Sequence, residues 1–154
     1  MNLTSTIELG KQIKAKRKEQ GFQQEDCAAY VGVSARTIRN IEKGFTGTKA
    51  ETVFTLMQEL GLRLFIGKKG DPQAWSLDNL KELSQHVYHT RKSQKIRQDD
   101  LAAIVDVQPS VIGRLEKTPN SVAIGTVFNV LHELGIVLSD QADCNRIDYR
   151  EGAE

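Results

Sequence analysis

The sequence predicts an all-α protein made of two tandem copies of one small domain, each copy ending in a short β-strand. The first observation is an internal repeat, because the sequence matches itself without a gap at an offset of 74 positions, the separation of Gln24 and Gln98. The second is that apolar residues recur at helical spacing between capping residues and glycines in both copies. Each copy is long enough to form its own core, so we expect the 154 residues to divide into two domains.

The repeat extends from about Leu9 and Leu83 to Leu64 and Leu138. Other matched positions include Arg17 with Arg91, Ile38 with Ile112, Glu42 with Glu116, and Glu59-Leu60-Gly61 with Glu133-Leu134-Gly135. We expect a first domain over 1–66, a linker over 67–76, a second and divergent domain over 77–140, and a polar tail over 141–154. The linker is punctuated by glycine and proline, and Trp75 is expected to anchor it against a domain.

The first helix of the first copy is predicted to begin after Ser5, because Ser5 and Glu8 have the spacing of a capping box. Gly21 ends that pattern. A short second helix is predicted over 24–31, and Gly32 follows where a tight turn favours a residue that tolerates positive φ. Ser34 is a good N-cap for a third helix, over 34–43, which Gly44 ends.

Thr48 and Glu51 form another capping-box pattern, which predicts the start of a fourth helix. Residues 62–66 alternate in polarity as a short strand does. In the second copy, Ser76 is expected to cap the first helix. The second copy then repeats the plan, with helices over about 77–92, 98–105, 109–117 and 124–134 and a strand over 136–138.

The bulk properties are those of an ordinary globular protein. A net charge of +1 and 39% hydrophobic residues exclude a disordered or strongly basic chain, so global charge does not indicate nucleic acid as a partner. No apolar run approaches the roughly 18 residues of a membrane span, and no secretory signal is recognisable. Two cysteines do not make a disulfide framework, so we expect a cytoplasmic protein without membrane contact, with Cys27 as a small buried hydrophobe.

Residues 24–44 carry the pattern that indicates function. Two short predicted helices joined by a glycine-containing turn form the helix-turn-helix arrangement. The small side chain of Ala28 lets the two helices cross closely. Val33, Ile38 and Ile41 are expected to hold the third helix on the core, which leaves its other side facing outward.

This stretch resembles the lambda-repressor/Cro-like (Xre) family, whose pattern is roughly Q-x-x-L-A-x-x-x-G-V-S-x-x-x-I-x-x-I-E-x-G. The matching residues are Gln24, Ala28, Gly32, Val33, Ser34, Ile38, Ile41, Glu42 and Gly44, whereas Cys27 replaces the usual leucine. The resemblance implies a lambda-repressor-like fold and a sequence-specific DNA-binding transcriptional regulator, with repression as the expected direction. The finer pattern is similar to the HipB-like antitoxins, in which the fourth helix ends in Leu-Gly and runs into a short strand, here over 58–66. The alternative function is therefore an antitoxin that binds and neutralises a HipA-like kinase toxin and autorepresses its operon.

In a helix-turn-helix protein the start of the third helix meets base edges in the major groove of double-stranded DNA. Arg36 is the best candidate for guanine, Thr37 for a thymine methyl group, and Gln24 for a backbone phosphate. The competing interpretation of Arg36 and Arg39 is a solvated helix face. The expected DNA-binding residues are Gln24, Ser34, Ala35, Arg36, Thr37, Arg39, Asn40 and Lys43 in the first copy, and Gln98, Ser110 and Arg114 in the second.

The second copy departs from the family pattern. Asp106 replaces the turn glycine, Gln108 the capping serine and Thr118 the final glycine, and Arg114 is the one cation among the residues expected to face outward from its third helix. If the strands over 62–66 and 136–138 pair within one chain, the monomer is a pseudo-dimer that reads an asymmetric operator. If the second copy has lost DNA contact, a homodimer presents two first copies to a palindrome. We favour the pseudo-dimer, with the first copy dominant.

We expect no enzyme, no cofactor and no metal site. His86 and His89 share a predicted helix face, but no cysteine or carboxylate cluster completes a ligand set around them. The first copy contains no histidine that could activate a serine nucleophile.

Overall fold

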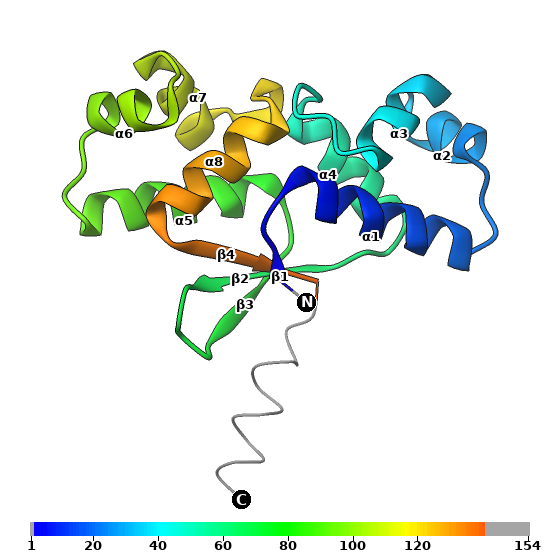
Figure 1. Ribbon diagram of the computed structural model, residues 1–154, viewed down its shortest axis with the longest axis horizontal. Coiled ribbons are helices and arrows are strands. Elements are labelled where there is room, and N and C mark those ends of the chain that lie inside the picture. The colour runs from blue at the N-terminus through cyan, green and yellow to red at the C-terminus, as the bar shows by residue number, and fades with distance from the viewer. Residues whose placement is uncertain (1, 141–154) are drawn as a thin grey trace, which may run out of the picture.

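The computed structural model describes residues 2–140, so the tail predicted over 141–154 lies outside the described residues. We call residues 2–68 the first half and residues 74–139 the second half. The helices of the first half are α1 (Thr6–Glu19), α2 (Gln24–Val31), α3 (Ala35–Glu42) and α4 (Ala50–Glu59). Those of the second half are α5 (Leu80–Ser93), α6 (Gln98–Val105), α7 (Pro109–Lys117) and α8 (Ile124–Leu134), with a short 3-10 helix, η1 (Pro119–Ser121), after α7. The predicted helical character is confirmed, and a small sheet lies beneath the helices (Figure 1).

The sheet joins the two halves at its centre. Its strands are β1 (Asn2–Leu3), β2 (Leu64–Lys68), β3 (Ala74–Leu77) and β4 (Ile136–Ser139), in the order β1-β4-β2-β3. β2 and β4 are antiparallel, with Phe65 opposite Ser139, so the pairing of the two predicted terminal strands within one chain is confirmed. Phe65 and Ser139 are equivalent positions of the repeat, which means that the two strands are related by an approximate two-fold axis at this pair.

The outer strands obey the same two-fold relation. Leu3 of β1 lies opposite Leu138, and Leu77 of β3 lies opposite Leu64, which are equivalent pairs at the repeat offset. The repeat therefore reaches from residue 2 to residue 139 in the structure, further than the sequence match indicates.

The expected start of the second half is wrong in two respects. Residues 74–77 form β3 rather than linker and first helical turn, because their backbone pairs with β2 along its length. Asn79 caps α5 in place of Ser76, accepting a hydrogen bond from the Glu82 amide at 2.9 Å. Trp75 lies on β3 rather than in a linker and is 48% exposed, and its ring centroid lies 6.4 Å from that of His86 on α5.

The predicted capping box at Thr48 is also wrong, because the other half of the chain caps α4. Lys49 occupies the N-cap position without a side-chain hydrogen bond. The amide of Ala50 donates to the Val122 carbonyl at 2.8 Å, and the amide of Ile124 donates to the Thr48 carbonyl at 2.8 Å. These equivalent bonds satisfy amides that a helix start leaves unpaired, so α4 and α8 cap each other through the backbone.

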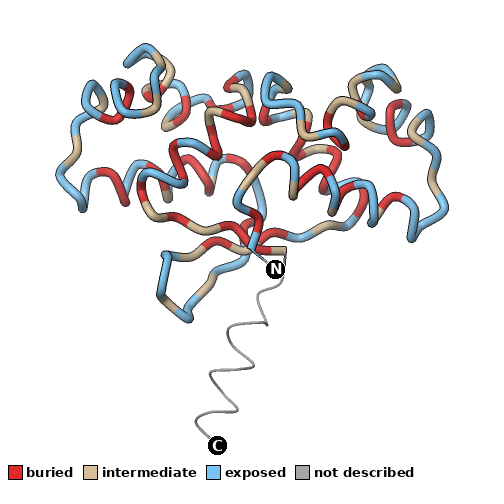
Figure 2. The backbone as a smooth tube through the Cα atoms, in the orientation of Figure 1, coloured by how far each residue is buried: buried red, intermediate tan, exposed pale blue. Residues whose placement is uncertain are grey.

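One hydrophobic core serves both halves. Ile13 and Val87, at equivalent positions, are both fully buried, and so are Leu56 and Val130. These residues belong to a single cluster, and Figure 2 shows that buried segments continue from one half to the other through the middle of the molecule. The two halves therefore share one interior.

Candidate nucleic-acid interface

A buried ion pair holds α3 against α1. The guanidinium of Arg17 donates to both oxygens of Glu42, from Nε to Oε2 at 2.6 Å and from Nη2 to Oε1 at 3.0 Å. Arg17 also donates from Nη1 to the Phe22 carbonyl at 2.8 Å, and Gln24 donates from Nε2 to Glu42 Oε1 at 3.1 Å. The hydrogen bonds to Glu42 raise the pKa of Arg17 above its usual value. Because four groups from α1, α2, α3 and the α1–α2 turn meet here, the orientation of α3 is tightly defined.

The same arrangement holds α7 in the second half. Arg91 donates to Glu116 from Nε at 2.6 Å and from Nη2 at 3.0 Å, and to the Ile96 carbonyl at 2.8 Å. Gln98 donates to Glu116 Oε1 at 2.9 Å. Equivalent ion-pair networks therefore hold α3 and α7 in place, although the two helices carry different residues on their outward sides.

The turn before α3 is built as the sequence predicts. Gly32 has a φ of +83° and donates to the Ala28 carbonyl at 2.8 Å. Ser34 caps α3, its Oγ accepting from the Thr37 amide at 3.2 Å and lying 3.1 Å from Thr37 Oγ1. Ile38 is buried beneath the helix.

The outward side of α3 carries unpaired cations. Arg36, Arg39 and Lys43 are exposed, and none of them forms a hydrogen bond or ion pair through its side chain with a residue in the described range 2–140. Thr37 and Asn40 are partly exposed beside them. Since the one acidic residue of α3, Glu42, is buried, this side of the helix presents positive charge alone.

Most of the other expected DNA-binding residues have partners within the protein. Gln24 and Gln98 each use one amide N–H inside the buried ion-pair networks, which leaves the second N–H and the carbonyl oxygen for a ligand. Ser34 is occupied as a cap, and Ala35 packs partly on the core. Of the residues expected in the second half, Ser110 and Arg114 are exposed, and Arg114 Nη1 donates to Ser121 Oγ at 3.3 Å.

The turn before α7 lacks the usual residues and still closes. Asp106 adopts the left-handed conformation, with a φ of +59°, which Asp tolerates better than most side chains. Gln108 makes no side-chain hydrogen bond at the N-cap of α7, and Pro109 occupies the first turn. The backbone of the motif is therefore preserved although its sequence has diverged.

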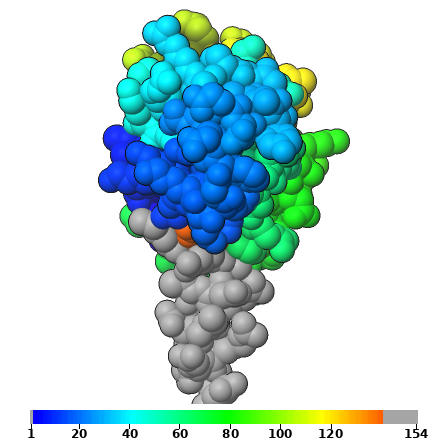
Figure 3. Space-filling view, turned by 90° about the vertical axis from the view of Figure 1, so that its right-hand side faces the viewer, coloured from blue at the N-terminus to red at the C-terminus, as the bar shows by residue number. Residues whose placement is uncertain are grey.

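The two motifs face the same way. Figure 1 shows α3 and α7 on the side of the molecule away from the sheet, one in each half, with α2 and α6 at the outer ends. Figure 3 looks onto the first half along the long axis, and α2 and α3 cover the part of that surface above α1. A single extended ligand on this side of the molecule would meet both motifs.

Two lysines near α7 were not expected as site residues. Lys81 of α5 and Lys117 of α7 line one hollow, although they lie far apart in the sequence. The packing of α5 against the end of α7 brings them together. The repeat offset of 74 could have identified Lys117, because it occupies the position of Lys43, which was expected to bind DNA.

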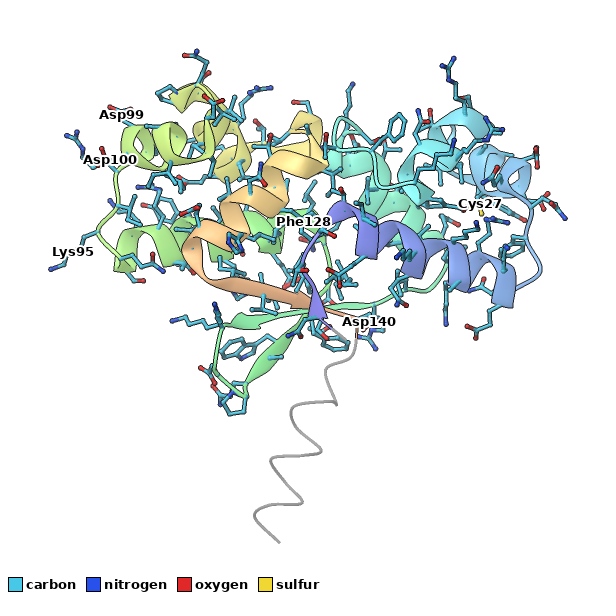
Figure 4. All side chains as sticks on the ribbon, viewed as in Figure 1. Cys27, Lys95, Asp99, Asp100, Phe128 and Asp140 are labelled. Atoms are coloured by element: carbon cyan, nitrogen blue, oxygen red, sulfur yellow. The ribbon has the colours of Figure 1, made fainter. Side chains whose placement is uncertain are left out.

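Two titratable side chains outside the ion pairs, His86 and Cys27, have shifted pKa values. Burial lowers the pKa of His86 and raises that of the thiol of Cys27, a buried residue of α2 (Figure 4). Asp99 and Asp100 project outward at the start of α6 (Figure 4). Within residues 2–140, no three His, Cys, Asp or Glu side chains are placed to hold a metal ion, and no helix is long and apolar enough to span a membrane.

Residues 13–65 match the helix-turn-helix family model. The match begins within α1, ends in β2 and contains α2, α3 and α4, about a third of the chain. No curated protein and no solved structure matches the chain significantly. The family model describes a DNA-binding regulatory domain, and the exposed cations of α3 lie inside the matched segment.

Proposed function

From the helix-turn-helix domain over residues 13–65, we propose that this chain is a sequence-specific DNA-binding transcriptional repressor that reads the major groove with α3. One observation carries the proposal: Arg36 and Arg39 project from a capped helix that a buried ion pair holds in place. A guanidinium that is unpaired in the free protein loses no internal partner when it meets DNA. Repression follows if the bound protein blocks access of the transcription machinery to the operator.

Each side chain on α3 suits a different part of the groove. Arg36 lies near the start of the helix, where its paired N–H groups can donate to O6 and N7 of guanine. Thr37 can place its methyl group against thymine. Arg39 and Asn40, one turn further along, reach either bases or phosphates, and Lys43 at the end of the helix suits a phosphate.

We infer that one chain supplies both halves of a pseudo-dimer. Helix-turn-helix proteins bind as two-fold dimers to half-sites about 34–36 Å apart. The pairing of β2 with β4 and the mutual capping of α4 and α8 support this assignment, since they join the halves as a dimer interface joins two protomers. The protein would act in the compartment that holds the DNA, the cytoplasm of a cell without a nucleus.

Replacement of Arg36 tests the proposal. DNA fragments that the protein selects from its own genome supply the operator, and binding of Arg36→Ala is then measured on it and on single-base variants. We expect a loss of about 1–3 kcal/mol of discrimination at one guanine and little change elsewhere, because one bidentate contact disappears.

Arg63→Ala is the matched control, since Arg63 is also exposed but lies on the sheet side, one residue before β2. Unchanged operator affinity and specificity in Arg36→Ala would show that α3 is not the recognition helix.

A second candidate function is the HipB-like antitoxin that binds a HipA-like kinase toxin. The favouring observation is an exposed pair of rings on the second half, away from α3, in which Trp75 is 48% exposed and its ring centroid lies 6.4 Å from that of His86. Gln12 occupies the position of His86 in the first half, so this surface is not repeated. Co-purification with the product of the neighbouring gene, lost in Trp75→Ala while operator binding stays, would support an antitoxin.

A further inference from the structure

The outward sides of α3 and α7 differ at the positions that would meet bases. At the repeat offset, Ser110 occupies the position of Arg36, and Gly113 occupies that of Arg39. The second half therefore lacks both guanidinium groups of the first. A serine hydroxyl can donate to or accept from any base, so Ser110 offers little discrimination.

The segments that follow α3 and α7 also differ, and here the second half carries more positive charge than the first. A hollow of about 410 Å³ in the second half is lined by Lys81, Lys117, Thr118, Pro119, Asn120 and Ser121, which include two cations and no carboxylate. Arg114 donates to Ser121 and adds a third cation at the rim. Such a set of donors suits a phosphate oxygen.

The equivalent place in the first half is apolar. Ile7 occupies the position of Lys81 and is 55% exposed, and Phe45 occupies that of Pro119 and is 52% exposed. Among these positions, only that of Lys43 and Lys117 is cationic in both halves. The half with two recognition arginines thus has one cation at this place, and the half without them has three.

We infer that the two halves make different kinds of contact with DNA. This inference rests on the proposed function. The first half reads bases with Arg36 and Arg39. In the second half α7 enters the adjacent groove without discriminating bases, and Lys81, Lys117 and Arg114 hold phosphates. Because phosphate groups are the same in every sequence, the operator consists of one specific half-site and one sequence-tolerant half-site.

Selection from a random duplex library tests the inference. The library is randomised over both half-sites, whose centres lie about 10 base pairs apart. We expect the selected duplexes to share bases in one half-site only. Two equally conserved half-sites would overturn this inference but keep the proposed function, whereas no enrichment of any sequence would overturn the proposed function itself.

The lysines are tested by their salt dependence on a selected duplex. In Lys81→Ile the first-half residue replaces the lysine, and Lys117→Ala removes the other cation. For each variant we expect a roughly five- to tenfold loss of affinity near 0.1 M salt, equal on every sequence of the tolerant half-site, and a salt slope smaller by about 0.9. Variants that fold, as their thermal unfolding shows, and keep the parent slope would overturn the phosphate role.

A double variant introduces into α7 the two arginines that α3 carries. Ser110 is exposed, and a Cβ at Gly113 would have no heavy atom within 4 Å beyond its own helix and chain neighbours, so Ser110→Arg with Gly113→Arg should fold. We expect this variant to prefer a symmetric operator, with two copies of the specific half-site, by about tenfold or more over the parent operator. A folded variant without this preference would overturn the placement of α7 in a groove.

Discussion

At the scale of single residues, the Arg17–Glu42 pair is the main contact that positions α3. The two side chains are 8% and 3% exposed, and the equivalent pair Arg91–Glu116 is buried to the same degree. Burying two charges costs free energy of desolvation, which the bidentate contact and the surrounding hydrogen bonds offset. The benefit is geometric, because a planar guanidinium bound to both carboxylate oxygens allows one orientation of α3 relative to α1.

Removal of one charge from this pair should destabilise the protein. Glu42→Gln leaves the Arg17 guanidinium buried without a counter-charge, so we expect the free energy of unfolding to fall by about 3–5 kcal/mol in urea titrations. Arg97→Ala is the control, because the Arg97–Asp100 pair is exposed at 3.5 Å and should contribute less than about 1 kcal/mol. A loss below 1 kcal/mol in Glu42→Gln would mean that the buried pair is not the support described above.

At the scale of secondary-structure elements, the close approach of α1 to α3 depends on Gly10. A Cβ at this position would lie 2.5 Å from the Ile41 carbonyl oxygen and 2.7 Å from that of Glu42. The second half carries buried Ser84 at the equivalent position, so the same approach is not required of α5 and α7. The end of α3 is thus held by backbone contact as well as by the ion pair.

Gly10→Ala should push α1 and α3 apart. The new methyl group meets backbone atoms that cannot rotate away, so we expect a loss of about 1–3 kcal/mol of stability together with weaker operator binding. Thermal unfolding and a DNA titration measure the two effects. Gly113→Ala is the control, since its Cβ lies in open space within α7 and should stabilise the protein by up to about 1 kcal/mol. An unchanged melting temperature in Gly10→Ala would refute the close-packing argument.

At the scale of the whole molecule, the halves depend on each other for backbone partners and for burial. Without the second half, the amide of Ala50 loses the Val122 carbonyl, and β2 loses both neighbouring strands. Leu64 and Ile66, both buried in the sheet, would face solvent. The segment of the first half that matches the helix-turn-helix family model is therefore completed structurally by the second half.

Truncation after Gly70 tests this dependence. We expect the fragment to unfold or to dimerise through β2, because one half leaves unpaired backbone groups and exposed apolar side chains at the missing interface. Light scattering after size exclusion gives the mass, and circular dichroism gives the helix content. A folded, monomeric fragment that binds the operator would contradict the shared core.

The local parts of the candidate site were predictable from the sequence. The bounds of α2 and α3 follow from the spacing of apolar residues, the cap at Ser34 and the glycine at position 32, all of which act within one or two helical turns. The same periodicity predicts Ile38 beneath the helix and Arg36 outside it, as observed. Repetition at a fixed offset extended the prediction to α6, α7 and α8.

What escaped prediction depends on residues that are distant along the chain. β3 forms because β2 offers it a partner, α4 begins without its expected cap because Val122 of the other half supplies a carbonyl, and Gln24 turns toward a carboxylate 18 positions away. Periodicity and capping patterns report interactions over a few residues, whereas these contacts arise only when the two halves pack about their two-fold axis. The helices were thus set by local sequence, and their mutual capping, the sheet and the cationic hollow of the second half were set by tertiary packing.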